Sequence, residues 1–307
     1  MKPARIPEEE YMTSGHVACQ GCGATQAMRF ALKALGPKTA LVIPACCWSV
    51  IDGPFPHSSL RVPLFHTAFE AAASTASGLK AGLEMRGDTE TTVMAWAGDG
   101  GTFDIGIQSL SGAAERNEDI IYTCYDNEAY MNTGIQRSSS TPVGAWTTTT
   151  PVAHYKKRPK KKIIDIMAAH SIPYIATASV AFPEDFIRKF KKAKEIKGTR
   201  FIHVFAPCPT GWKLPPELSV AMARQAVTSK VFPLLEVTEH GKRWKVWKDF
   251  EPTPVRDYIK AQGRFRHLKD EEIKAIEEEV ENNWQLLLAR EQMSMNLPGL
   301  NKEDDDS

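Results

Sequence analysis

The sequence predicts an α/β fold, a doubly wound and mostly parallel sheet with a C-terminal extension. Short apolar segments that are typical of buried strands alternate with longer segments whose apolar residues recur at the helical period. Such alternation is typical of a parallel sheet covered by helices. Strands are expected at residues 39–43, 91–96, 119–125, 172–177 and 201–205, with helices at 24–35, 66–85, 105–116, 163–170 and 183–195.

The elements in the middle of the chain are the best defined. Thr-Thr-Val-Met-Ala-Trp at 91–96 is a buried type of strand, the helical spacing of 105–116 follows it, and 119–125 is the next strand. The helix expected at 66–85 is rich in Ala, Ser and Gly, so its backbone can approach a neighbour closely. Packing against the sheet is the favoured interpretation, ahead of contact with a cofactor or a partner chain.

The sequence changes in character after Trp212, so residues 1–212 are predicted to form one α/β domain. Residues 213–300 are predicted to be an extension that packs on this domain or on partner subunits. It contains a helix near 217–230, strand-like segments at 235–237 and 244–247, and a charged amphipathic helix at 269–290. The acidic tail, residues 301–307, is predicted to be disordered.

A glycine-rich turn, Gly98-Asp99-Gly100-Gly101, follows the strand at 91–96, and Asn127 follows the next strand. Small residues let backbone N–H groups approach phosphate oxygens, while a carboxylate and an amide oxygen are ligands that Mg²⁺ accepts. The spacing therefore fits a metal–diphosphate site. An ordinary Gly-Asp turn is the alternative for the tetrapeptide taken alone.

The six cysteines include a Cys19-Gln-Gly-Cys22 pair, the adjacent Cys46 and Cys47, and Cys208 between two prolines. A metal site, a redox dithiol and buried thiols all remain open. Zinc sites of four cysteines usually combine two short pairs, whereas iron–sulfur clusters accept one pair with scattered single cysteines. Cys124 lies within an apolar strand and is predicted to be a core residue.

The segment Asp-Asn-Glu-Ala-Tyr-Met-Asn-Thr-Gly at 126–134, continuing to Thr141-Pro142, resembles the β subunit of the pyruvate and other 2-oxoacid:ferredoxin oxidoreductases. The resemblance covers residues 15–212 and includes the Gly-Asp-Gly turn of thiamine diphosphate enzymes. It implies that Asp99, Asn127 and the carbonyl of Ala129 bind the Mg²⁺ of thiamine diphosphate. It also implies that Asn132 lies beside the reacting substrate and polarises it, the alternative being an Asn that caps its own loop.

The same resemblance implies one [4Fe–4S] cluster, and its ligands map onto Cys19, Cys22, Cys47 and Cys208. Cys47 is preferred to Cys46 because the residues that follow it match the family better. Cys47, Asp99, Asn127 and Cys208 each follow a predicted strand, at the edge where ligands bind in sheets of this type. Both cofactors are therefore expected side by side.

The function implied by the resemblance is oxidative decarboxylation of a 2-oxoacid, with pyruvate as the first choice, and CoA as acceptor to give acyl-CoA and CO2. Electrons would pass from the thiamine adduct through the cluster to ferredoxin. Oxalate, branched-chain and aryl 2-oxoacids are alternatives. More remote ones are a non-redox thiamine diphosphate decarboxylase or transferase, and a non-enzymatic Cys₄ metal scaffold.

The chain contains only one thiamine-type half, and Glu70 is not assigned as the glutamate that activates the pyrimidine. An α subunit is expected to supply the pyrimidine half and substrate contacts, with γ and ferredoxin-like δ subunits or domains completing the complex. The Lys156-Lys-Arg-Pro-Lys-Lys-Lys162 run could dock ferredoxin or a partner subunit, but a solvated loop is favoured.

Composition is that of a globular intracellular enzyme, with 307 residues, a net charge of +1 and 42% hydrophobic residues. Neither a signal peptide nor an apolar run of membrane-spanning length is recognised, and nothing indicates nucleic-acid binding. A cytoplasmic location is expected.

Overall fold

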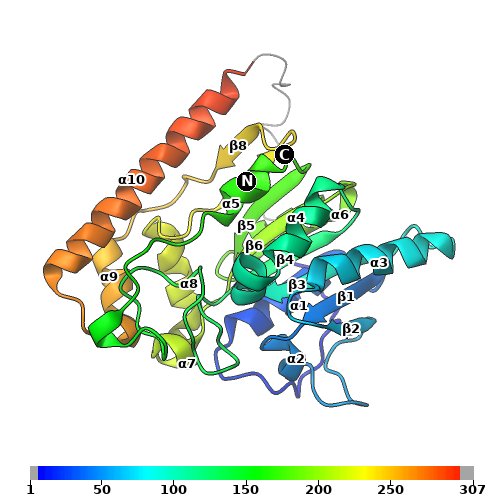
Figure 1. Cartoon of the computed structure of the whole chain (residues 1–307), viewed down its shortest axis with the longest axis horizontal. Helices are drawn as coiled ribbons and strands as arrows, with labels where there is room; N and C mark the ends of the chain where they lie inside the picture. Colours follow the sequence, from blue (N-terminus) through cyan, green and yellow to red (C-terminus); the bar gives the residue numbers. More distant parts are fainter. Residues whose placement is uncertain (1–5, 298–307) are drawn as a thin grey trace.

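The computed structural model describes residues 6–297, which form one eight-stranded sheet with helices on both faces (Figure 1). The strand order is β2-β1-β3-β4-β6-β5-β7-β8. The first six strands are parallel, β7 is antiparallel to β5, and β8 is antiparallel to β7. The strands are β1 (Thr39–Pro44), β2 (Leu64–Thr67), β3 (Thr92–Gly98), β4 (Ile121–Asp126), β5 (Tyr174–Ser179), β6 (Arg200–Phe205), β7 (Leu235–Thr238) and β8 (Arg243–Val246).

The helices alternate with the parallel strands and then continue into the C-terminal part of the chain. They are α1 (Gly23–Leu35), α2 (Trp48–Ile51), α3 (Ala72–Met85), α4 (Ile107–Glu115), α5 (Ile163–Ala169), α6 (Pro183–Glu195), α7 (Pro209–Trp212), α8 (Ser219–Thr228), α9 (Val255–Lys260) and α10 (Asp270–Met295). A π-helix, η1 (Gly100–Ile105), precedes α4, and short 3₁₀ turns lie at η2 (Val152–His154), η3 (Pro216–Leu218) and η4 (Gly263–Phe265).

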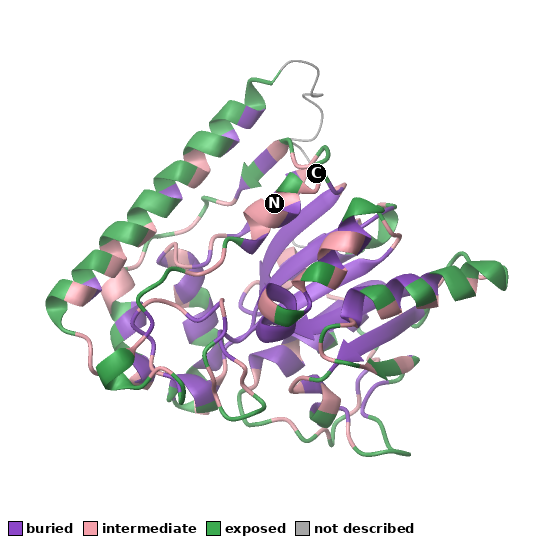
Figure 2. Cartoon of the chain, viewed as in Figure 1, coloured by how far each residue is buried: buried purple, intermediate pink, exposed green. Residues whose placement is uncertain are grey.

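Alternate residues of the strands face two separate cores, one on each side of the sheet. In β3, Met94 and Trp96 belong to the core shared with α1, α6 and α8, while Val93, Ala95 and Ala97 belong to the core shared with α3, α4 and α5. The parallel strands of the centre are buried along their whole length (Figure 2). Burial on both faces explains their continuous apolar sequences.

The predicted fold class is confirmed, including the five strands, but one prediction about the elements was wrong. Residues 66–85 do not form a single helix, because 64–67 form the edge strand β2 and α3 begins at Ala72. Only one side of β2 has a strand partner, and its residues are partly or fully exposed, so the segment lacks a continuous apolar signal. The small residues Ala72, Ala73 and Ala76 pack into the core as expected.

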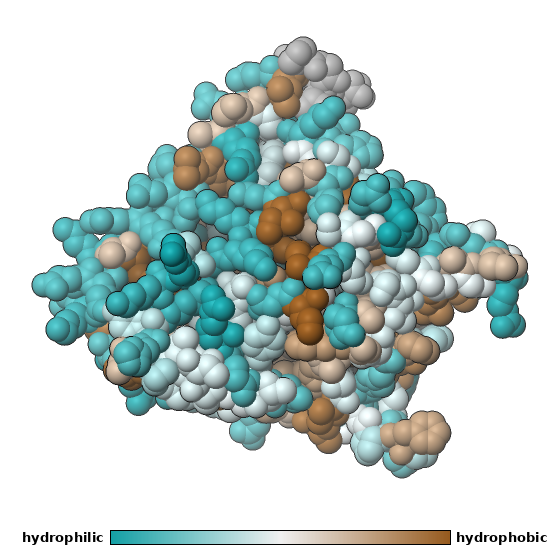
Figure 3. Space-filling model, viewed as in Figure 1, coloured by the Kyte–Doolittle hydropathy of each residue, from teal (hydrophilic) through white to brown (hydrophobic). Residues whose placement is uncertain are grey.

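The C-terminal residues continue the sheet and cover one end of it. β7 pairs with β5, β8 pairs with β7, and α10 packs against β8 and α9. The outer face of α10 is largely hydrophilic, as its charged sequence predicts (Figure 3). A domain boundary at residue 212 stays a prediction, and the acidic tail at 301–307 lies outside the described residues.

None of the helices within residues 6–297 is long and apolar enough to cross a membrane.

Candidate active site

Four neighbouring strands end at the same edge of the sheet, and a predicted site residue follows each of them. Cys47 follows β1, Asp99 follows β3, Asn127 follows β4 and Cys208 lies beyond β6. These strands are adjacent in the order β1-β3-β4-β6, so the connections that leave them meet in space. The structure therefore places the glycine turn, the amide and two of the thiols at one edge.

The three predicted Mg²⁺ ligands converge on one point. The tip of the Asn127 amide lies 3.1 Å from Asp99 Oδ1 and 3.0 Å from the carbonyl oxygen of Ala129. With its NH₂ group on this side, the amide donates to both oxygens. Turned over, the amide would present a third oxygen. Adjacent ligands of an octahedral Mg²⁺, with metal–oxygen distances near 2.1 Å, stand about 3 Å apart, so the oxygens fit this ion.

The electrostatics around Asp99 also favour a cation. Asp99 is only 1% exposed, accepts a hydrogen bond from Ser138 Oγ, and forms no ion pair within residues 6–297. Burial, followed by the nearby charges of Asp126 and Glu128, raises the pKa of Asp99 well above its usual range. A divalent ion would stabilise the charged carboxylate and offset the repulsion from the neighbouring acids.

Aromatic side chains pack closely against the glycines of the turn. A Cβ at Gly100 would lie 2.4 Å from the ring of Tyr130, and one at Gly101 would lie 3.2 Å from the ring of Phe69. A Cβ at Gly98 would lie 3.3 Å from Tyr125 Oη. A side chain at Gly100 would displace Tyr130, so the turn requires glycine there.

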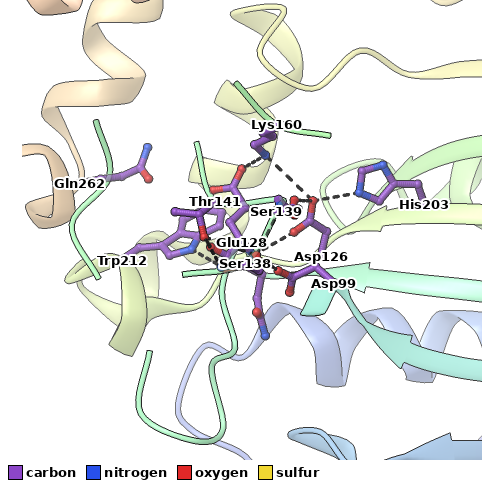
Figure 4. Close-up of polar contacts among 12 residues, drawn as sticks. Asp99, Asp126, Glu128, Ser138, Ser139, Thr141, Lys160, His203, Trp212 and Gln262 are labelled. Atoms are coloured by element: carbon purple, nitrogen blue, oxygen red, sulfur yellow. Dashed lines mark hydrogen bonds and ion pairs between the residues drawn. The ribbon is translucent and has the colours of Figure 1, made fainter. Parts of the chain in front are cut away.

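Behind the oxygen group lies a buried network of acids and cations that the sequence did not reveal (Figure 4). Asp126 Oδ2 lies 2.9 Å from His203 Nε2 and 4.0 Å from Lys160 Nζ. Although burial opposes it, Lys160 and His203 hold the pKa of Asp126 below its usual range. Glu128 pairs with both Lys160 and Arg264. The acids that flank Asn127 are therefore ion-paired and held in place, and one of the cations, Arg264, comes from the C-terminal part of the chain.

The segment 138–141 ties this network to the glycine turn. Ser140 Oγ donates to Asp126 Oδ2, and Thr141 Oγ1 donates to the carbonyl of Glu128 at 2.7 Å. Ser139 N donates to Asp104 Oδ2 at 3.0 Å, and Tyr130 Oη donates to the same oxygen at 2.9 Å. The two sides of the site are thus held together by hydroxyl and carboxylate groups.

The basic run at 156–162 was predicted to be a solvated loop, and this is wrong for three of its members. Lys156 is 5% exposed and donates to the carbonyls of Ser139 and Thr141, at 3.1 and 2.5 Å. Lys160 pairs with Asp126 and Glu128, and Lys161 donates to the carbonyl of Phe103. These lysines offset buried acids and carbonyl dipoles, whereas Lys157, Arg158 and Lys162 are exposed.

The predicted cluster ligands lie near one another and are free thiols, with Cys19 exposed and the other three half-buried. Burial, together with nearby Cys46, Cys208 and Cys22, raises the pKa of the Cys47 thiol. Burial, and the proximity of Cys22 and Cys19, raises the pKa of Cys208 to about 11. The Cys47 and Cys208 thiols would ionise more readily with a positive charge nearby, such as that of a bound metal.

The thiols are not arranged for a single metal ion. Within residues 6–297, no three His, Cys, Asp or Glu side chains are grouped so that they could hold one ion. Each cysteine of a [4Fe–4S] cluster binds a different iron, so its thiolates surround a larger body than one zinc ion. A site for a single zinc ion is therefore not favoured among the described residues.

The other two cysteines have different surroundings. The Cys46 thiol hydrogen-bonds with Tyr125, and burial raises its pKa, whereas Cys47 interacts with Cys208 and Cys22. This supports Cys47 over Cys46 as a ligand. Cys124 is fully buried in the core of the sheet, as predicted.

Asn132 is exposed in the turn at 131–134. In the part of the chain that the structure describes, its side chain makes no hydrogen bond that would cap the loop. Its predicted role beside the substrate stays a prediction, and an exposed amide is available to a substrate or to a partner chain.

The residues missed from the sequence differ in how detectable they were. His203 interrupts the apolar run of β6, and Asp126 and Glu128 flank Asn127, so each carried a local signal. Arg264 and Trp212 carried none, because their roles arise only when the C-terminal part folds back onto the loop after β4. Trp212 Nε1 donates to the carbonyl of Asn127 at 2.9 Å.

Comparisons with known proteins agree with this geometry. Residues 52–204 match the family described as thiamine pyrophosphate enzyme, C-terminal TPP binding domain. The chain is 53% identical to the ketoisovalerate oxidoreductase subunit VorB of Pyrococcus furiosus, covering 93% of this chain and 95% of that protein. It is 50% identical to the pyruvate synthase subunit PorB of Methanothermobacter marburgensis, covering 91% and 97%.

Among solved structures, the chain is similar to a 2-oxoglutarate:ferredoxin oxidoreductase from Magnetococcus marinus, with a TM-score of 0.57 and 22% identity. The alignment covers 73% of this chain and 83% of that one, and at this identity it supports the fold. The identity of 50% or more to VorB and PorB over nearly the whole length goes further: the chain belongs to the 2-oxoacid:ferredoxin oxidoreductase family.

Proposed function

We propose that this chain is the β subunit of a 2-oxoacid:ferredoxin oxidoreductase and that it holds Mg²⁺, the diphosphate of thiamine diphosphate and one [4Fe–4S] cluster. The main support for the proposal is the convergence of Asp99, Asn127 and the Ala129 carbonyl near the thiols of Cys22, Cys47 and Cys208, which are half-buried and lie near one another. A non-redox thiamine enzyme would leave the thiols without a role. A metal scaffold would leave the oxygen group without one.

Each part of the site has a task in this proposal. Asp99, Asn127 and Ala129 would bind Mg²⁺, while Gly98, Gly100 and Gly101 let the diphosphate approach the backbone. When bound, thiamine diphosphate supplies the carbanion chemistry that decarboxylation of a 2-oxoacid needs. Cys19, Cys22, Cys47 and Cys208 would hold the electron acceptor next to it.

Asn132 would meet the substrate from the exposed side of the site. Its side chain is free to donate to a carbonyl or carboxylate oxygen, which suits a group that orients a 2-oxoacid. The pyrimidine half of the cofactor and further substrate contacts are then expected from an α subunit. VorB and PorB are themselves named as subunits. The γ and ferredoxin-like δ subunits, external ferredoxin and CoA complete the proposed system.

The names of the relatives indicate two candidate substrates. Pyruvate is the first choice from the family resemblance, and PorB of Methanothermobacter marburgensis is 50% identical. A branched-chain 2-oxoacid is the second choice, because the two Pyrococcus furiosus relatives differ: VorB is 53% identical and PorB is 44% identical. Turnover of the complete complex with pyruvate, 2-ketoisovalerate, oxalate and an aryl 2-oxoacid separates these choices.

The central test is the cofactor content of the anaerobically purified complex. We expect iron, acid-labile sulfide and thiamine, with a visible absorption band that bleaches when the 2-oxoacid is added. Zinc without iron would support a scaffold, and thiamine without iron would support a non-redox enzyme. The isolated chain is expected to show no 2-oxoacid oxidation. Full turnover by the isolated chain would overturn the division of the cofactor between subunits.

A further inference from the structure

Two loops with different proposed tasks are joined side by side. The first follows β4 and contains Asn127 and Ala129, which lie at the oxygen group. The second follows β6 and runs from Cys208 through α7. β4 and β6 are neighbours in the sheet, and the last contact of the pair is Ala206 N donating to the carbonyl of Asp126 at 2.9 Å. Beyond that point, side chains make the connection.

Trp212 provides the most direct connection. It is fully buried, and its indole N–H donates to the carbonyl of Asn127 at 2.9 Å. Its backbone N–H donates to the carbonyl of Cys208, also at 2.9 Å, which closes the single turn of α7. One residue therefore bonds to a proposed metal ligand and to a proposed cluster ligand.

Met131 and Gly211 make a second contact between the loops. A Cβ at Gly211 would lie 2.2 Å from Met131 Sδ and 3.6 Å from Cys208 Sγ, so Met131 packs directly on this peptide. The Gly211 N–H also donates to Cys208 Sγ at 3.4 Å. The loop after β4 therefore rests on the same turn whose N–H contacts the thiol.

Arg264 holds the indole in place from the other side. Its guanidinium lies 4.1 Å from the centre of the Trp212 ring, and it pairs with Glu128, the residue after Asn127. Arg264 Nε donates to Gln262 Oε1 at 2.9 Å, so the cation is itself held in position. A buried stack with both groups fixed leaves Trp212 little freedom to move independently of residues 127–128.

We propose that Trp212 is a positioning residue that couples occupancy of the Mg²⁺–diphosphate site to occupancy of the cysteine cluster. The inference rests on the proposed function. A metal bound at the oxygen group fixes the positions of Asn127 and Ala129. The hydrogen bond from the Trp212 indole to the carbonyl of Asn127 then also fixes the turn that follows Cys208. Because coupling between two sites is reciprocal, a loaded cluster must favour binding of the metal–diphosphate by the same factor.

The test compares two forms of the complete complex, one with its cluster and one from which the cluster has been removed by oxidation and chelation. The dissociation constant of Mg²⁺–thiamine diphosphate is measured in each form. We expect the loaded form to bind roughly 5- to 150-fold more tightly, the usual range for coupled sites. Equal dissociation constants in the two forms would overturn the inference without requiring any variant.

The variant Trp212→Phe keeps an aromatic ring over Arg264 and removes the indole N–H. We expect the ratio of the two dissociation constants to approach one in this variant. In the wild type, adding Mg²⁺–thiamine diphosphate is expected to shift the reduction potential and the electron paramagnetic resonance spectrum of the cluster, and in Trp212→Phe both shifts are expected to disappear. A wild-type ratio in Trp212→Phe would overturn the role of this residue.

Trp244→Phe is the matched control, because Trp244 is also buried and its Nε1 donates to a backbone carbonyl, that of Gly241, at 3.2 Å. Trp244 lies in β8, away from both loops, so Trp244→Phe should keep the wild-type ratio of the two dissociation constants.

Absence of iron and thiamine from the wild-type complex would refute the proposed function itself. Independent binding of both cofactors would refute only the coupling.

Discussion

The amide of Asn127 lies 3.1 Å from Asp99 Oδ1, although the two residues follow different strands. Asp99 is a buried acid that receives hydrogen bonds from Ser138 and from this amide, with the charged Asp126 nearby. Such an arrangement is unfavourable for a carboxylate alone and favourable for one that shares a cation with an amide oxygen. It makes Asp99 the residue on which metal binding depends most.

We expect Asp99→Asn to weaken binding of Mg²⁺–thiamine diphosphate to the complex by more than about 100-fold, a larger effect than loss of an outer contact to a metal ligand. The metal-free variant should be as stable as the wild type, or more stable by about 1 kcal/mol, because an uncompensated buried acid is removed. Calorimetric titration and thermal unfolding measure these effects. Asp165→Asn, at an exposed ion pair with Arg290, is the control. Wild-type affinity in Asp99→Asn would exclude this metal site.

The central fold was predictable because both faces of the central strands are buried, which leaves long apolar runs in the sequence. The edge strand β2 could not be predicted, because its residues are partly exposed and its pairing with β1 joins residues that are far apart in the sequence. In the site, Asp99 and Asn127 were found because each directly follows a strand. The cations that balance the acids come from a loop and from the C-terminal part, and no local pattern specifies Lys160 or Arg264 as their partners.

The adjacent cysteines after β1 provide a test of the cluster ligands. Cys47 lies near Cys208 and Cys22, whereas the Cys46 thiol hydrogen-bonds with Tyr125. We expect Cys47→Ser to lose most of the iron and visible absorption of the complex, since serine replaces a thiolate ligand. Cys46→Ser should retain wild-type iron content. The opposite pattern, measured by metal analysis after anaerobic purification, would assign the ligand to Cys46.

Lys160 and Lys162 belong to the same basic run but have different environments. Lys160 pairs with Glu128 and lies 4.0 Å from Asp126, while Lys162 is exposed. Replacing Lys160 by Met leaves two buried acids with less positive charge. We expect Lys160→Met to lower the free energy of unfolding by about 2 kcal/mol. This is less than the 3–5 kcal/mol typical of breaking a fully buried ion pair, because the Lys160 side chain is 29% exposed.

Lys162→Met is the matched control and should change the unfolding free energy by less than about 0.5 kcal/mol. Denaturant unfolding at neutral pH measures both variants. Ferredoxin reduction at low salt separates this role from docking: if the run docks ferredoxin, Lys162→Met slows reduction. Equal stability of the two variants would contradict the structural role of Lys160.

Glu236 in β7 is a charged residue that connects this strand to β5 and α6. Its carboxylate lies 2.8 Å from Arg188 Nη1 and 3.3 Å from Lys192 Nζ, and accepts a hydrogen bond from Tyr174 at 2.6 Å. Burial raises its pKa, but these cations and Lys189 outweigh that effect and lower the pKa to about 2. The unfolded chain would bind a proton at this residue near pH 4.5.

The unfolded state therefore holds more protons at Glu236 between about pH 4.5 and pH 2, so stability falls as the pH is lowered through this window and is fully present above it. The difference in pKa corresponds to about 3 kcal/mol. We expect Glu236→Gln to lower the free energy of unfolding by about this amount at pH 7. We also expect its free energy of unfolding to fall less steeply than that of the wild type as the pH is lowered from 4.5 to 2. Glu90→Gln, whose carboxylate is 70% exposed, should keep the wild-type profile. If Glu236→Gln kept the wild-type pH dependence below pH 4.5, Arg188 and Lys192 would not stabilise the native state through this carboxylate. The attachment of β7 would then depend on its strand pairing and apolar contacts alone.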